Sequence, residues 1–182
     1  MRIALGGFMK KRFLIFLLVA LMLFSVIALS SCKEEVNIPD APKGYIMFYN
    51  SEIYFAYPEN WISQTINEVT RLMPSVGGNN ITVSKGEYHS NLDNLTVDSF
   101  NKYLLPSLTA SGLEVSNLTI THDLTKGFDI ATISYDTSTN GINMKQTIYM
   151  FKAHDGMYNV MITEVTDDLS LVRTVFNTLG IN

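Results

Sequence analysis

Two short turn signals in the C-terminal half of the chain place the strongest constraint on its fold. Asn140-Gly141 and Asp155-Gly156 each lie between segments rich in β-branched and aromatic residues. Such pairs suit the two-residue loop of a β-hairpin, where the backbone must adopt positive φ angles. The flanking segments are expected strands at about 128–135, 142–153 and 157–165. Because consecutive hairpins pair neighbouring strands, the sheet is predicted to be antiparallel.

Further strands are expected upstream of these hairpins. The β-rich runs on either side of Asn50-Ser51 predict another hairpin, after which Pro58-Glu59-Asn60 turns the chain toward Trp61. Residues 73–80 predict a loop because they combine proline, glycine and asparagine. The additional expected strand regions are 45–57, 81–88 and 115–124.

The segment "LTVDSFNKYLLPSLTASG", residues 95–112, predicts an amphipathic helix. Thr96 is the expected N-cap, Asp98 falls in the first turn, and Gly112 suits the C-terminal stop. Pro106 should kink or shorten the helix, because proline lacks a backbone N–H. The expected apolar stripe consists of Val97, Phe100, Leu104 and Leu108.

A second helix is expected to start at Asp167 or Asp168 and to stop at Gly180. Its expected buried stripe is Leu169, Val172, Phe176 and Leu179. Antiparallel strands with two inserted helices predict an α+β fold, in which helices pack on an antiparallel β-sheet. Apolar residues occur on both faces of the last strand, residues 157–165, which indicates that both faces of the sheet are covered.

The N-terminal segment has the pattern of a secretory signal. Lys10-Lys11-Arg12 precedes an uncharged apolar run, residues 13–29, and small residues follow. The ending "LSSC" resembles the bacterial lipobox and contains Cys32, the chain's only cysteine. That resemblance implies that Cys32 receives a diacylglyceryl group and becomes the mature N-terminus. Either Met1 or Met9 fits as the start, because Met9 directly precedes the basic cluster.

This pattern predicts three regions. Residues 1–31 form a lipoprotein signal peptide, residues 32–43 a lipidated N-terminus and polar tether, and residues 44–182 one folded domain. The domain is then anchored to the membrane through Cys32 and faces outside the cytoplasm, at the cell membrane or the outer surface of a bacterium. The alternative is an uncleaved membrane anchor, because 17 apolar residues reach the lower limit of a spanning helix.

The charge of the chain argues against nucleic acid as a partner. All 17 acidic residues follow Cys32, whereas four of the 13 basic residues precede it, so the part from Cys32 onward has a formal charge of −8. Binding to phosphates requires an excess of lysine and arginine, which this part lacks. A single cysteine also allows no disulfide within the chain, so packing of the core must supply the stability.

The order of these elements resembles a known family. A hairpin leads into "FAYPENW", and a strand "NITV", the helix "LTVDSFNKYL", the hairpin "TIYMFKAHDGMYNVMIT" and a terminal helix follow. Over residues 45–179 this order resembles the PsbP-like fold, which also includes DcrB-like bacterial envelope lipoproteins and a Ran-binding protein. The resemblance implies a PsbP-like α/β sandwich and a non-catalytic accessory or binding module. No metal-site residue of the photosynthetic members is carried over.

His122 and Trp61 are the candidate residues for a ligand pocket. His122 shares the alternation of Leu118, Ile120 and Leu124, so it is expected to point toward the apolar face of its strand. A buried histidine there either lines a pocket or is a hydrogen-bonded core residue. Trp61 could stack on a sugar or peptide, or it could fill the space where the hairpin ends.

The other two histidines favour plainer interpretations. His154 precedes Asp155 at a predicted turn, where an exposed residue is expected rather than an acid–base pair. His89 lies in a polar segment where Glu87 or Asp93 could share a metal, although no second histidine lies close in sequence. The chain contains no Gly-x-Ser-x-Gly, phosphate-loop, dinucleotide or His-Glu-x-x-His motif.

Together these observations predict a non-catalytic binding or accessory module, with an envelope protein complex as its expected partner. No catalytic residue, cofactor or metal is assigned. The alternative is a small-ligand or metal-binding protein with a pocket near His122 and Trp61. A hydrolase using His154-Asp155, or His89 with a serine, has the least support.

Overall fold

The computed structural model describes residues 38–87, 91–139, 141–165 and 169–182. Within these ranges the chain forms two antiparallel sheets, three α-helices and one 3-10 helix. The predicted signal peptide and Cys32 lie outside the described residues, and so do His89, Asn140, Asp167 and Asp168.

The larger sheet has the strand order β3-β4-β5-β9-β8-β7-β6, and the smaller sheet has the order β1-β2-β10. The strands are β1 (Tyr45–Tyr49), β2 (Ile53–Pro58), β3 (Ile62–Ile66), β4 (Val69–Met73), β5 (Asn80–Glu87), β6 (Glu114–Asp123), β7 (Ile130–Thr139), β8 (Ile142–Ala153), β9 (Gly156–Glu164) and β10 (Gly180–Ile181). The helices are η1 (Leu92–Asn94), α2 (Val97–Tyr103), α3 (Leu105–Ala110) and α4 (Ser170–Thr178). The predicted α+β class with antiparallel pairing is confirmed.

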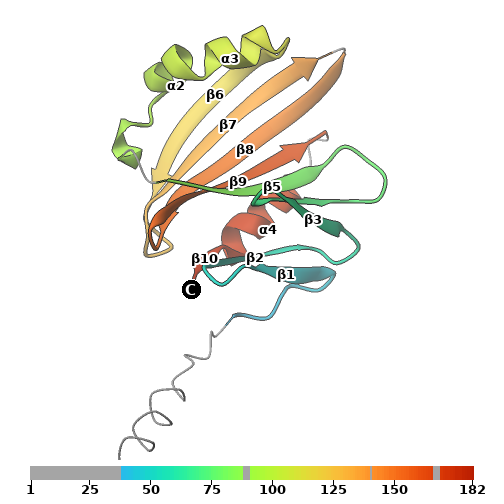
Figure 1. Ribbon diagram of the computed structural model, residues 1–182. Coiled ribbons are helices and arrows are strands. Elements are labelled where there is room, and N and C mark those ends of the chain that lie inside the picture. The colour runs from blue at the N-terminus through green and yellow to red at the C-terminus, as the bar shows by residue number, and fades with distance from the viewer. Residues whose placement is uncertain (1–37, 88–90, 140, 166–168) are drawn as a thin grey trace, which may run out of the picture. The chain divides into compact units, whose positions relative to one another are not determined.

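The main core lies between the two sheets and α4. Alternate residues of β2, β5, β8 and β9 point into it, and Phe151 at its centre is fully buried. The Phe151 ring centroid lies 5.4 Å from that of Phe128 and 5.9 Å from that of Tyr158. Helix α4 closes this side, where the Tyr149 hydroxyl donates a hydrogen bond to the Val172 carbonyl at 3.0 Å. Figure 1 shows α4 beside the smaller sheet, on the side of the larger sheet opposite α2 and α3.

The opposite face of the larger sheet carries a separate, smaller core. Phe100 of α2 is buried there against Ile133 and Tyr135 of β7. Beside this group, Met157 of β9 packs with Leu92 of η1. Apolar cover on both faces is predicted from the last strand, and these contacts confirm it, because the neighbouring β9 residues Met157 and Tyr158 belong to different cores.

The predicted helix at residues 95–112 is present but broken. Thr96 caps α2 as expected, because its side chain accepts a hydrogen bond from the Ser99 N–H at 3.2 Å. The break falls at Leu104, Pro106 lies in the first turn of α3, and Gly112, with φ of +80°, follows the end of α3. The stripe prediction is partly wrong, since Val97 and Leu104 are 40% and 45% exposed. The break ends the regular stripe, so only the Phe100 side chain is deeply buried in α2.

The predicted stripe of the last helix is also partly wrong. Its buried residues are Leu171, Val175 and Leu179, while Val172 and Phe176 pack against the core at its side. The buried face shifts because α4 contacts both β2 and the larger sheet. The helix ends at Thr178, and the predicted stop residue, Gly180, instead begins β10 opposite Tyr54.

The last hairpin turns one residue earlier than predicted. Ala153 pairs with Gly156, so the two-residue loop is His154-Asp155, and His154 has a φ of +52°. Gly156 is the first residue of β9, and a Cβ there would overlap the Lys85 side chain that crosses it. The Asp-Gly pair therefore marks the hairpin correctly, but its glycine serves a close approach rather than the turn.

Strands β3 and β4 have no counterpart among the predicted elements. They form a hairpin around Asn67 and Glu68, both of which have positive φ angles. Every residue of β3 is exposed, so the strand lacks the apolar alternation that would have marked it in the sequence.

Candidate functional site

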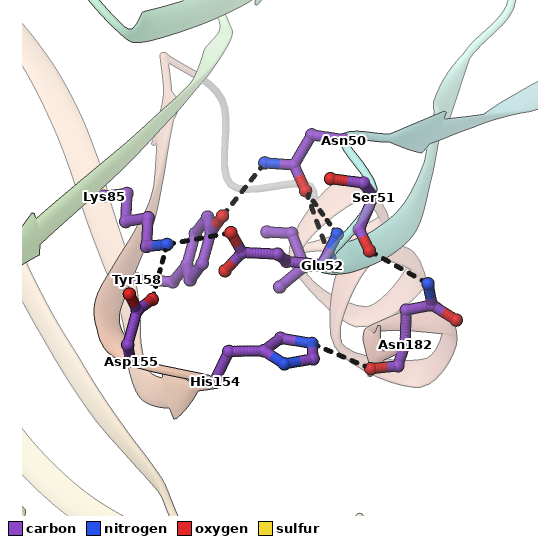
Figure 2. Close-up of polar contacts among 9 residues, drawn as sticks. Asn50, Ser51, Glu52, Lys85, His154, Asp155, Tyr158 and Asn182 are labelled. Atoms are coloured by element: carbon purple, nitrogen blue, oxygen red, sulfur yellow. Dashed lines mark hydrogen bonds and ion pairs between the residues drawn. The ribbon is translucent and has the colours of Figure 1, made fainter.

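A polar cluster connects the two sheets at the turns that precede β2 and β9 (Figure 2). The Lys85 Nζ lies 2.8 Å from the Glu52 Oε1 and 2.9 Å from the Asp155 Oδ1. Glu52 belongs to the β1–β2 turn and Asp155 to the β8–β9 turn. Lys85 stands opposite Tyr158 in the β5–β9 register, which directs its side chain over Gly156 toward both carboxylates.

The charges of this cluster stabilise one another. Hydrogen bonds to Glu52 and Asp155 raise the pKa of Lys85, and the Lys85 ammonium lowers the pKa of Asp155. A lysine held in its charged form has no lone pair with which to act as a base or a nucleophile. The contacts of Lys85 therefore fit a link between the sheets, not a reactive centre.

We expect Lys85→Met to lower the melting temperature at pH 7. The raised pKa of Lys85 stabilises the native state below about pH 10, and the lowered pKa of Asp155 stabilises it above about pH 4. Both effects are therefore present together only between about pH 4 and pH 10. The difference from wild type should narrow as the pH falls below about 4, where carboxylates become protonated.

Thermal unfolding followed by circular dichroism from pH 2.5 to 8 would measure this difference. Lys43→Met is the matched control, because Lys43 is exposed and forms no ion pair with any residue in the described part of the chain. If Lys85→Met lowers the melting temperature by the same amount at every pH, the assignment of pH-dependent stability to this cluster is contradicted.

His154 and Asp155 point in different directions (Figure 2). The His154 Nε2 lies 3.0 Å from the Asn182 backbone oxygen, whereas Asp155 contacts Lys85. His154 is an exposed turn residue, as the sequence favours. The neighbouring side chains contact separate partners, so their adjacency in sequence does not create an acid–base pair.

Trp61 and His122 contact different parts of the fold. Trp61 is partly buried and packs at the edge of the main core, where the chain leaves β2. His122 pairs with Ala131 and thus lies on the α2 side of the larger sheet, the side predicted from its alternation. Its expected burial is wrong, because β6 is the edge strand of the larger sheet; the side chain is 35% exposed.

His122 instead lies beside two carboxylates that the sequence did not associate with it. One ligand atom from each of Asp93, His122 and Asp129 lies within 4.8 Å of the other two. Asp93 belongs to η1, His122 to β6, and Asp129 directly precedes β7. In the sequence, Asp93 lies near His89 as a possible shared metal ligand, but His89 lies outside the described residues. The one available signal was the short connection between the two expected strands, residues 115–124 and 128–135, because their pairing brings Asp129 near His122.

Three hollows stand out on the described surface, and Trp61 and His122 do not line any of these three. The largest of the three, about 700 Å³, is lined by residues at the start of β6 and β8 and at the end of β7 and β9, including Glu164. A second, about 290 Å³, lies between α2 and Met150 and is lined mainly by apolar groups. The third, about 380 Å³, adjoins the end of α4. The suggested pocket near His122 and Trp61 therefore stays a prediction.

No protein-family model and no curated protein matches the sequence. The solution structure of cyanobacterial PsbP (CyanoP) from Synechocystis sp. PCC 6803 is similar with a TM-score of 0.61 at 15% identity, covering 84% of this chain and 98% of that one. A Bacteroides thetaiotaomicron VPI-5482 protein matches with a TM-score of 0.47 at 12% identity, covering 71% of this chain and 45% of that one. The likeness to the Synechocystis protein shows that this chain has a PsbP-like fold.

None of the helices in the described ranges combines the length and the apolar character needed to span a membrane.

Proposed function

We propose that the chain is a bacterial lipoprotein, anchored through Cys32 outside the cytoplasm, whose domain is a non-catalytic binding or accessory module for an envelope protein complex. The observation that carries this proposal is a PsbP-like fold in a chain that also contains a lipobox-like segment at residues 29–32. The resemblance to PsbP-like and DcrB-like proteins favours an accessory role, since their fold is shared by modules of this kind.

The geometry of the polar groups is consistent with a domain that binds rather than catalyses. Lys85 is held by two carboxylates, and His154 and Asp155 face different partners. Lipidation would supply a stable attachment, because each buried methylene of an acyl chain contributes about 0.8 kcal/mol.

The first experiment tests the anchor. In a bacterial host, wild type should incorporate radiolabelled palmitate and sediment with membranes, and intact-mass analysis should show loss of residues 1–31. Cys32→Ala should incorporate no label, and Ser31→Ala is the matched control because alanine also suits a lipobox. The uncleaved anchor would be supported instead if wild type takes up no label, keeps residues 1–31 by mass, and binds membranes as firmly as Cys32→Ala.

The second experiment tests the accessory role. A C-terminally tagged chain is captured from native membranes in mild detergent, beside the Cys32→Ala variant. We expect one envelope protein in stoichiometric amount with wild type and much less with the variant. A lipidated wild type that is captured alone, also after chemical crosslinking in cells, would contradict the accessory role.

The alternative, a small-ligand or metal-binding protein, has one specific observation in its favour. Asp93, His122 and Asp129 come together only in the folded chain.

A further inference from the structure

We propose that Asp93, His122 and Asp129 bind a divalent metal ion of the zinc type. The site does not involve Trp61, and it goes beyond the proposed accessory function, on which it does not depend. It lies at the end of β6, where the chain enters β7 and where η1 approaches the sheet edge.

The spacing of the three side chains is close to that of a coordination site. Two atoms bonded to one zinc ion at about 2.0–2.2 Å can be no more than about 4.4 Å apart. The ligand atoms of Asp93, His122 and Asp129 all lie within 4.8 Å of one another, and the His122 Nδ1 lies 3.8 Å from the Asp129 Oδ1. Small rotations of these partly exposed side chains would bring them to bonding distance.

The His122 ring is already oriented for coordination. Its Nε2 lies 3.3 Å from the Leu95 backbone carbonyl, which can only accept a hydrogen bond, so Nε2 carries the proton. In the neutral ring this leaves a lone pair on Nδ1, the nitrogen that faces Asp129. Metal-bound histidines commonly donate their second ring N–H to a carbonyl or a carboxylate in this way.

Asp93 is oriented by a second set of contacts. The Asn91 side-chain amide donates a hydrogen bond to the Asp93 Oδ2 at 2.8 Å, and the Asn91 Oδ1 accepts one from the Asp93 N–H at 3.2 Å. The Asp93 carboxylate is therefore held by Asn91 without help from a cation.

The charge balance distinguishes this group from the Lys85 cluster. Glu52 and Asp155 share the ammonium of Lys85, whereas within the described ranges no lysine or arginine forms an ion pair with Asp93 or Asp129. Two carboxylates and one imidazole leave a net negative site that a divalent cation would neutralise. The imidazole favours zinc and similar transition metals over magnesium and calcium, which prefer all-oxygen ligands.

Three protein ligands leave at least one coordination position open to water or to a donor from another molecule. Because the ligands come from η1, β6 and the residue before β7, the unfolded chain cannot form this site. Bound metal is therefore expected to stabilise the native state.

Isothermal titration calorimetry tests the site directly. Zinc chloride is titrated into the full chain, purified in detergent and freed of metal with a chelator. We expect one zinc per chain, with affinity reduced at least tenfold in His122→Gln and in Asp129→Asn and lowered also in Asp93→Asn. Calcium and magnesium should bind at least tenfold more weakly than zinc.

The matched controls are His154→Gln, Asp155→Asn and His89→Gln, which should all bind zinc as wild type does. Zinc should also raise the melting temperature of wild type but not that of His122→Gln, which would show that a folded variant has lost the site. The proposal is overturned if wild type binds no zinc, if His122→Gln and Asp129→Asn retain wild-type affinity, or if His89→Gln loses the affinity instead.

Discussion

Replacement of Phe151 by alanine is expected to lower the free energy of unfolding by about 3–5 kcal/mol, the usual range for removal of a buried aromatic ring. Phe151 is 0% exposed and lies in β8 at the centre of the main core. Its ring contacts those of Phe128 and Tyr158, which come from the segment before β7 and from β9. Truncation would leave a cavity that neighbouring strands, fixed by their hydrogen-bond register, cannot close.

Urea unfolding would measure this loss. Trp61 is the chain's only tryptophan and packs against the same core, so its fluorescence reports on the core directly. Tyr103→Ala removes an aromatic ring that is 67% exposed, and as a matched control it should change the free energy by no more than about 0.5 kcal/mol. A Phe151→Ala loss below about 1 kcal/mol would show that the core between the sheets does not hold the fold together.

The sequence predicted the elements whose determinants are local. The hairpins of β7, β8 and β9 follow from alternation and from turn residues within a few positions, and the cap of α2 follows from Thr96 together with Ser99 three positions later. Pro106 likewise acts on its own helix. In each case the physical cause lies inside the element, so the sequence contains it.

The predictions of burial and of strands were wrong where the structure of a segment depends on residues far away in the sequence. Val97 and Leu104 fit an apolar stripe but are exposed, and β3 forms a strand although all its residues are exposed. His122 points to the predicted side of its strand, yet it is exposed because β6 is the edge strand of the sheet. Alternation fixes the side to which a residue points, whereas its burial depends on what packs above it.

The candidate metal ligands show the same limit. Asp93 lies 29 positions before His122, and Asp129 follows seven positions after it, so their spacing has no motif. Two conditions bring them together: the β6–β7 pairing, and the packing of Leu92 and Leu95 against the outer face of the sheet. The sequence indicates the two strands of the first condition, but the second requires the position of η1, which no sequence pattern indicated.

Phe100→Ala tests whether this outer face is a separate structural unit. Phe100 is 1% exposed, and its ring centroid lies 5.4 Å from that of Tyr135. A helix of seven residues is not stable in isolation, so the position of α2 depends on this contact. We expect removal of the ring to cost about 3 kcal/mol or more, as for other buried phenylalanines, and to act mainly as local opening of α2 and α3.

Hydrogen exchange followed by mass spectrometry would locate the effect of Phe100→Ala. Amides of α2 and α3 should lose protection, while those of β2, β5 and β9 in the main core should keep it. Leu104→Ala is the control on the same helix, because Leu104 is 45% exposed, and it should change protection little. Equal loss of protection in both cores would contradict the separation.

Zinc affinity should fall with Phe100→Ala although no ligand is changed, because Asp93 and the Leu95 carbonyl precede α2 and depend on its attachment to the sheet.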